Sequence, residues 1–377
     1  MQESNRNYTL DLIRGVSALI VLMSHLRAAM FLDFNQLDLN VGTGIIAKVF
    51  YFITGLGHQA VMVFFVLSGY FVGGSILKLR KKFTFKKYLI ARLSRLWTPL
   101  IPILFFTLFI DYFLNILFPE IISGNYYDIL NSGPTTDYSN SIITFISNIL
   151  FLQTTMTPVY GSNGPLWSLA YEFWYYIIFP LIAIVVGVIP SSVWNKIISI
   201  IFIILISVTV STNMLQGFLI WMLGVGVYYI TTKNNIKTNT LFITIFILFF
   251  VVSLIHSKFH FFNSKNDFLE DLFVGLAFSG LLISIINYQL PKISFLNLRK
   301  LSFGLSEISY TLYILHFPLV LLIYGIFYIK DQEVFSVSSL LQFFAWSLFL
   351  IIVSALFWYL FERNTNSVRQ FMIKIFK

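Results

Sequence analysis

Two histidines and a glutamate, His25, His316 and Glu172, lie inside apolar stretches of the sequence, where ionisable side chains are costly and usually serve a function. His25 lies about six residues before the end of its stretch, and Glu172 about six after the start of its own. In helices that cross in opposite directions, both are expected at a common depth of about 9 Å. A carboxylate beside an imidazole orients it, fixes its tautomer and raises its basicity. His25 and Glu172 are therefore predicted to be catalytic.

Structural interpretations stand beside this one. Instead of a catalytic role, Glu172 could have a purely structural one in an ion pair, with Arg27 as one partner. His316 is followed by Pro318, and a local helix kink would also account for that segment. Asp111 is expected to face the interior of a helix bundle.

Arginines on the first apolar stretch and just before the third suggest a site for an anion. Arg14 precedes His25 by eleven residues, close to three helical turns, so both face the same way about 16 Å apart along the axis. Asp11 lies one turn before Arg14, and an interfacial ion pair between them is the alternative. Arg92 and Arg95 end a run of eight basic residues, at positions 78 to 95, that contains no acid. Two guanidinium groups on one face suit a multiply charged phosphate ligand, and a lipid phosphate is the alternative ligand.

Composition determines what kind of element positions these residues. Of the 377 residues, 58% are hydrophobic and 11% charged, against about 45–50% and 25% in a soluble domain. A soluble protein is excluded, and the absence of cysteine excludes disulfides, thiolate metal sites and a cysteine nucleophile. Ten transmembrane helices are predicted, over Leu10–Phe31, Gln59–Leu77, Leu96–Phe118, Leu166–Val188, Ile197–Ser211, Leu215–Ile230, Thr240–His256, Leu269–Tyr288, Glu307–Ile329 and Leu340–Phe361.

Further features of the chain complete the predicted topology. Two shorter apolar stretches, Ile45–Ile53 and Ile142–Leu152, are too brief to span and are read as re-entrant or interfacial. Most Lys and Arg fall on the side of the N-terminus, which places both termini in the cytoplasm. The net charge of +9 then reflects topology and anionic lipid, not nucleic acid. The fold class is an all-α polytopic membrane bundle, forming a single domain over 1–377 with no appended soluble domain. No metal site is predicted, because the spacing of His58, His256 and His260 matches no metal motif.

Five short motifs resemble, in content and order, those of the acyltransferase-3 family of integral membrane acyltransferases. They are Asp11-Leu12-Ile13-Arg14-Gly15 followed by His25, Phe64-Phe65-Val66-Leu67-Ser68-Gly69-Tyr70, Arg92-x-x-Arg95, Leu166-Trp167-Ser168-Leu169-x-x-Glu172 and Ser309-Tyr310-x-Leu312-Tyr313-x-x-His316. The sequence departs from the family pattern at Ile13, where Leu is usual, and at Ala170-Tyr171, where many members have Ser-Val. Neither departure removes an ionisable group.

The resemblance implies transfer of an acyl group, commonly acetyl, from cytoplasmic acyl-CoA as co-substrate to a hydroxyl of a cell-envelope carbohydrate outside the membrane. Arg14, Arg92 and Arg95 would bind acyl-CoA, and the thioester would reach toward His25. Whether His25 takes a proton from the sugar or first receives the acyl group stays open. The expected location is the bacterial inner membrane, and the oligomeric state is left open.

Other residues and one other function complete these expectations. Asp11, Ser68, Trp167, Tyr310 and His316 lie in the same motifs and are predicted to support the site. The alternative function is a transporter of polysaccharide or lipid-linked sugar, in which intramembrane charges line a pathway. Against it, the sequence has no repeat symmetry, and its charges gather at one cytoplasmic mouth and one deeper site. The role of the predicted outer loop, residues 119–165, is not evident from the sequence.

Overall fold

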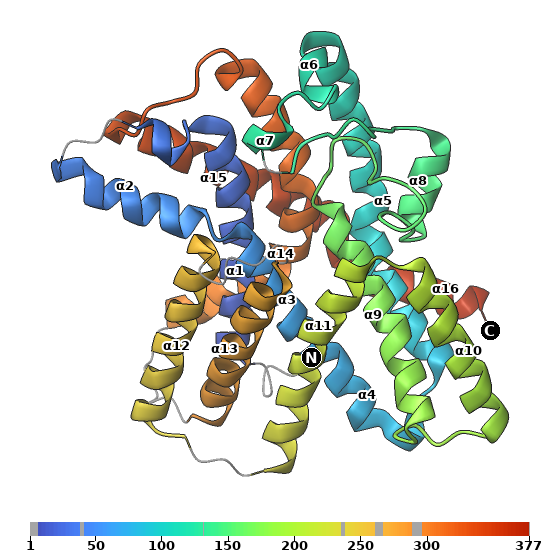
Figure 1. Cartoon of the computed structure of the whole chain (residues 1–377). Helices are drawn as coiled ribbons and strands as arrows, with labels where there is room; N and C mark the ends of the chain where they lie inside the picture. Colours follow the sequence, from blue (N-terminus) through green and yellow to red (C-terminus); the bar gives the residue numbers. More distant parts are fainter. Residues whose placement is uncertain are drawn as a thin grey trace. The chain divides into compact units, whose positions relative to one another are not determined.

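The chain folds into helices in the computed structural model (Figure 1). The structure describes residues 7–37, 41–130, 132–234, 238–260, 267–288 and 296–376, and within these ranges it has three isolated β-bridges and no strand. The predicted all-α polytopic bundle is confirmed. The first six residues and Lys377, the two ends predicted to be cytoplasmic, lie outside the described residues.

Nine helical segments in the described ranges are long and apolar enough to cross a membrane, and they match nine of the ten predicted spans. They are formed by α1 (Tyr8–Met30), α2 (Val41–Thr54) with α3 (Gly57–Ser68), η3 (Gly69–Gly73) and α4 (Gly74–Leu79), α5 (Phe85–Leu117), α9 (Leu166–Val185), α11 (Thr212–Lys233), α12 (Thr240–Phe259), α13 (Phe268–Asn287), α14 (Leu296–Ile323) with η5 (Tyr324–Tyr328), and α15 (Val337–Leu360) with α16 (Thr365–Ile375). The tenth prediction corresponds to α10 (Val193–Thr209), which is shorter at 17 residues. Three short helices, α6 (Pro119–Ile122), α7 (Tyr127–Leu130) and α8 (Ile142–Ile149), lie between α5 and α9.

Polar caps fix where several helices begin. Ser141, Ser192, Ser211, Asn239 and Ser336 each accept a hydrogen bond from the backbone N–H three residues further on. Such a cap satisfies one of the N–H groups that a helix start leaves unpaired. As a result only two residues, 210 and 211, separate α10 from α11, where the sequence predicted a connection at residues 212–214.

The chain divides into two compact units that alternate along the sequence. Unit 1 consists of the residues up to Leu10, then His58–Leu89 and Tyr171–Leu301. Unit 2 consists of Asp11–Gly57, Ile90–Ala170 and the residues from Ser302 onward. A single domain over 1–377 stays a prediction.

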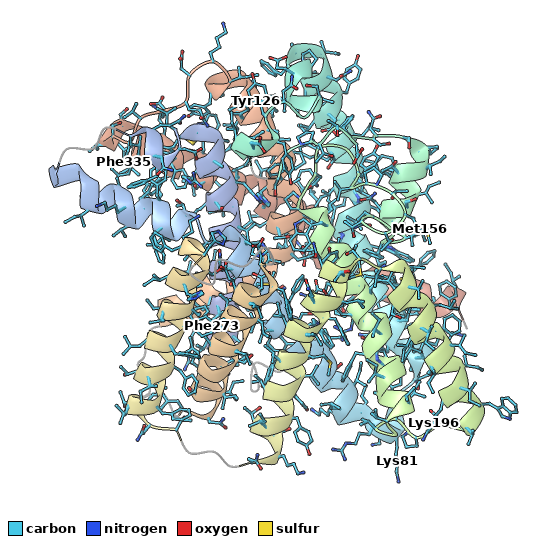
Figure 2. The ribbon with its side chains drawn as sticks, in the orientation of Figure 1. Lys81, Tyr126, Met156, Lys196, Phe273 and Phe335 are labelled. Atoms are coloured by element: carbon cyan, nitrogen blue, oxygen red, sulfur yellow. The ribbon has the colours of Figure 1, made fainter. Side chains whose placement is uncertain are left out.

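In unit 1, α11 packs against both α13 and the π-helical turn η3. The backbone of α11 comes into contact with the backbone of the last turn of α3, just before η3, because a Cβ on Gly224 would lie 1.9 Å from the Val66 carbonyl oxygen. The helix α13 also packs against α12, where Phe273 of α13 contacts a phenylalanine of α12 with ring centroids 5.3 Å apart (Figure 2). Figure 2 also shows Lys81 and Lys196 at the same end of this unit, as the positive-inside pattern predicts for a cytoplasmic face.

In unit 2, α1 packs closely on α14. A Cβ on Gly15 would lie 2.5 Å from the Leu305 Cβ, so a larger residue there would force the helices apart. Tyr310 of α14 donates a hydrogen bond to the Leu96 carbonyl oxygen of α5 (3.2 Å). The helices α1, α5 and α14 therefore form the framework that holds most of the predicted site residues.

Candidate functional site

The polar stripe of α1 is bound to serines of α14. Ser306 donates to the Asp11 carboxylate (3.0 Å), and the Arg14 Nε donates to the Ser309 hydroxyl (3.0 Å). Asp11 is buried. These bonds fix the face of α1 that carries His25 against α14, so the predicted alignment of Arg14 and His25 on one helix face places both at the same helix contact.

His25 and His316 form the centre of this contact. The Nδ1 of His25 lies 2.8 Å from the Nε2 of His316, and the two rings are nearly parallel, with 9° between their planes. His316 is fully buried, and Phe317 contacts the His25 ring edge-on at 4.9 Å between centroids. From the sequence, His316 had two interpretations, a structural role at a local helix kink and a functional role. The structure places it in direct contact with His25.

The hydrogen bonds of the pair fix its tautomers. The Nδ1 of His316 lies 3.0 Å from the Leu312 carbonyl oxygen, which can only accept, so this nitrogen carries the hydrogen. In a neutral ring the His316 Nε2 then holds the lone pair and accepts from the His25 Nδ1. The remaining nitrogen of His25, Nε2, therefore holds the lone pair of that ring and is the atom able to take a proton or attack a carbonyl carbon.

Glu172 belongs to unit 1, where it accepts hydrogen bonds from Ser68, a residue of a predicted motif, and from Tyr176. Ser68 donates to the Glu172 carboxylate (2.6 Å), Tyr176 donates to the same oxygen, and the Trp221 indole N–H donates to Ser68 (3.1 Å). Ser68 thus acts on Glu172 directly, as a supporting residue would. Because His25 belongs to unit 2, its pairing with Glu172 stays a prediction. Arg27, the alternative partner of Glu172, lies over the Tyr51 ring at 5.3 Å.

Two of the three arginines predicted to bind an anion share an acidic neighbour that sequence reasoning missed. Arg14 and Arg95 both attract the carboxylate of Glu362, a buried residue that follows α15. This carboxylate also accepts the backbone N–H (3.2 Å) and the hydroxyl (2.5 Å) of Thr311 on α14. An acid at the predicted cytoplasmic end of a span, where bases prevail, was the signal in the sequence that could have identified Glu362. Arg92 lies one turn before Arg95 and is partly buried.

Ser168, which follows Trp167 at the start of α9, connects α9 to α14. The Ser168 hydroxyl lies 2.6 Å from the Tyr313 hydroxyl, and the Tyr313 ring lies 6.1 Å from that of His316. Tyr313 also donates to the Pro165 carbonyl oxygen (3.1 Å). The start of α9 is therefore held on the same turn of α14 that carries His316.

One group of side chains could hold a metal ion, although the sequence predicted none. His260, Asp267 and Glu270 place their ligand atoms within 4.8 Å of one another, and the His260 Nδ1 lies 2.8 Å from the Glu270 carboxylate. Nearby on α13, Asp271 pairs with His58 at 2.8 Å. The carboxyl–imidazole pairs join α3 and the end of α12 to the first turn of α13 within unit 1, a role that needs no ion.

A family model described as an acyltransferase domain matches residues 7–363. Neither the curated proteins nor the solved structures contain a match.

Proposed function

The chain belongs to the acyltransferase-3 family and is a membrane acyltransferase, and from this premise we propose that it acetylates a carbohydrate hydroxyl of the bacterial cell envelope. The donor is cytoplasmic acetyl-CoA, and the acceptor lies on the outer side of the inner membrane. The observation that carries the proposal is the hydrogen-bonded pair of His25 and His316, which leaves one nitrogen of His25 as a base or nucleophile.

The chemistry proposed for His25 is acyl transfer by its Nε2. In the direct route, this nitrogen takes the proton of the sugar hydroxyl while the oxygen attacks the thioester carbonyl, and CoA leaves as the thiol. In the covalent route, Nε2 attacks the thioester carbonyl and expels CoA as the thiolate. The sugar hydroxyl oxygen then takes the acyl group from Nε2, and the hydroxyl proton passes to the freed Nε2. In both routes His316 holds His25 in the tautomer that leaves Nε2 unprotonated. Glu172, held by Ser68 and Tyr176, is proposed as the second catalytic group.

The donor site proposed for acyl-CoA is formed by Arg14, Arg92 and Arg95, of which Arg14 and Arg95 lie near Glu362. Arg92 and Arg95 would bind the phosphates at the cytoplasmic mouth, and Arg14 would lie deeper, one turn after Asp11 on the helix that carries His25. Their guanidinium groups suit phosphate because each presents two parallel donors. Tyr310, which binds the α5 backbone next to Arg95, supports this mouth.

The test uses purified protein in detergent with [¹⁴C]acetyl-CoA and a membrane carbohydrate fraction as acceptor. Wild type is expected to release CoA and to label the carbohydrate, and His25→Ala to lose both activities while it still binds CoA and stays folded in the detergent. Loss of the base or nucleophile should lower the rate by at least about 10²–10⁴-fold. Substantial turnover by His25→Ala would reject the assignment of His25. Sugar movement across proteoliposomes without any CoA release by wild type would favour the transporter instead.

A further inference from the structure

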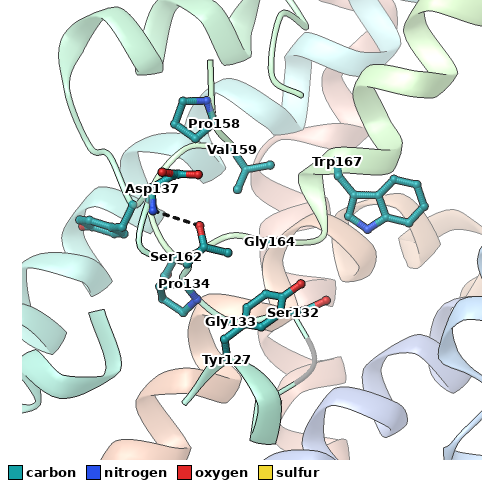
Figure 3. A pocket seen from close by; sticks show the side chains of 13 residues that line it. Tyr127, Ser132, Gly133, Pro134, Asp137, Pro158, Val159, Ser162, Gly164 and Trp167 are labelled. Carbon is teal, nitrogen blue, oxygen red and sulfur yellow. Dashed lines mark hydrogen bonds between the residues drawn. The ribbon is translucent and has the colours of Figure 1, made fainter. Parts of the chain in front are cut away.

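A pocket of about 300 Å³ opens among the loops between α7 and α9 in unit 2 (Figure 3). We call it the loop pocket; its lining residues are Tyr127, Ser132, Gly133, Pro134, Thr135, Asp137, Tyr138, Pro158, Val159, Gly161, Ser162, Gly164 and Trp167. All but Trp167 belong to the segment that the sequence predicts as the outer loop. Its volume lies at the lower end of the range of small-molecule sites.

The lining of the loop pocket combines aromatic rings, hydroxyl groups and one carboxylate. Three rings line it, those of Tyr127, Tyr138 and Trp167, together with the exposed carboxylate of Asp137. None of the thirteen lining residues is basic, so the pocket offers no charge partner to a phosphate. Sugars present C–H faces that pack on aromatic rings and hydroxyls that bond to carboxylate and hydroxyl groups.

We propose that the loop pocket binds the carbohydrate acceptor. The proposal rests on the proposed acyl transfer to a carbohydrate, and it adds the place where that substrate is held before reaction.

Buried hydrogen bonds hold the walls of the pocket in shape without a ligand. Asp111 of α5, which is fully buried, accepts the backbone N–H (2.8 Å) and the hydroxyl (2.5 Å) of Ser162, and the Tyr138 hydroxyl (3.2 Å). Gly161 has a φ of +58°, and a Cβ there would lie 2.1 Å from the Asp111 carboxylate. Burial, with the nearby Asp111 charge, raises the pKa of Tyr138, so its hydroxyl stays a donor. A pocket formed in advance spares a ligand the cost of ordering these loops.

The same loop is bound to the helix that carries His316. The Asn163 side chain, next to the lining residue Ser162, donates to the Ile314 carbonyl oxygen (2.8 Å), two residues before His316. The start of α9, which carries Trp167, is joined to Tyr313 through Ser168. A sugar in the loop pocket would therefore be held by loops that are fixed on the turn of α14 beside the imidazole pair.

Binding to an array of bacterial surface oligosaccharides, with labelled protein in detergent, tests the proposal. Wild type is expected to bind at least one oligosaccharide. Tyr127→Ala, Trp167→Ala and Asp137→Asn should each bind it about tenfold more weakly or worse, since anchoring side chains carry most of the energy of an interface. The matched controls are Trp194→Ala and Asp128→Asn, which change exposed residues outside the pocket and should bind as wild type does. CoA affinity, which should not change in Tyr127→Ala, Asp137→Asn or either control variant, reports on folding.

The outcomes separate this proposal from the proposed function. Absence of glycan binding by wild type, or wild-type binding by all three lining variants, would overturn the acceptor pocket. If [¹⁴C]acetyl transfer proceeds and the lining variants keep the wild-type acceptor KM, the pocket is wrong and the acyl transfer stands. If the lining variants lose glycan binding but wild type never cleaves acetyl-CoA, the pocket stands and the acyl transfer is wrong.

Discussion

His316 determines the tautomer of His25 through a single hydrogen bond. With its own Nδ1 bound to the Leu312 carbonyl, it can accept only through Nε2, and so it holds a hydrogen on the Nδ1 of His25. This arrangement resembles the role of a carboxylate that orients a catalytic imidazole, except that a neutral ring takes the place of the charged group. In the proposed mechanism His316 is thus a positioning residue, which acts on the reaction through the nitrogen that His25 leaves free.

His316→Phe is expected to lower kcat by about 10²–10⁴-fold, because His25 loses the acceptor that fixes its tautomer. The KM for acetyl-CoA should stay within about twofold of wild type, and the pH dependence of kcat should shift. Steady-state kinetics over a range of pH measure all three quantities. His256→Phe on α12 is the control for removal of an intramembrane imidazole elsewhere. A rise in KM with kcat and its pH profile unchanged would show that His316 shapes the donor site and not the base.

At the scale of elements, the loop between α7 and α9 depends on one buried carboxylate of α5. Asp111→Ala removes the acceptor of three hydrogen bonds, from the Ser162 N–H, the Ser162 hydroxyl and the Tyr138 hydroxyl. A buried donor without a partner costs about 1–3 kcal/mol, so the variant should have a clearly lower Tm in detergent. Asp128→Ala, at an exposed position of α7, should leave the Tm unchanged. Equal Tm values for the two variants would mean that the loop is held by other contacts.

Two glycines of α11, two residues apart, allow the effect of close helix packing on stability to be compared with the effect of helix propensity. A Cβ at Gly224 would meet the Val66 carbonyl oxygen at 1.9 Å, whereas nothing lies within 4 Å of a Cβ at Gly226. Gly224→Ala should destabilise the protein by more than about 1 kcal/mol, and Gly226→Ala should be neutral or stabilise it by up to about 1 kcal/mol. Thermal unfolding of both variants in the same detergent measures the contrast. Similar losses in both would contradict a backbone contact at residue 224.

The sequence predicts the parts of the site that depend on short-range spacing within a helix, and it does not predict the parts that depend on contacts between distant residues. The spacing of Asp11, Arg14 and His25 is local, and helical periodicity was enough to put them on one face, where the structure has them against α14. Asp111 was expected to face the interior, and it is buried. The contact of His25 with His316 joins residues 291 positions apart, and no local pattern encodes it. The loop pocket depends on turn geometry, such as the positive φ of Gly161, and periodicity carries no information about it.

Helix ends were predicted least well, for a reason visible in particular residues. The connection between α10 and α11 was expected at residues 212–214, where the apolar run is interrupted. Ser211 instead caps α11, so Thr212 and Asn213 lie inside its first turn. The first turn of a helix tolerates polar residues because its N–H groups need acceptors. A prediction that starts the helix at its first run of apolar residues therefore places the start of such a helix too late.

At the scale of the whole molecule, the charge pattern predicts which ends of the helices face the cytoplasm. The chain has no cysteine, so a single introduced cysteine is its only thiol. Lys81→Cys and Lys196→Cys should react with a membrane-impermeant thiol reagent only after the cells are permeabilised, and Asp128→Cys should react in intact cells. A mass shift of the purified protein measures labelling. Reaction of Lys81→Cys in intact cells would reverse the predicted orientation.

The contact between α1 and α14 has a consequence for the synthesis of the protein. Asp11 and Arg14 enter the membrane with the first helix, but their partners Ser306 and Ser309 are made 295 residues later. At about 5–20 residues per second, the ribosome needs roughly 15–60 s to supply them. During that time an acid and a base on α1 lack the hydroxyl groups that bind them in the finished protein. Water, lipid headgroups or the insertion machinery must cover this polar stripe until α14 arrives.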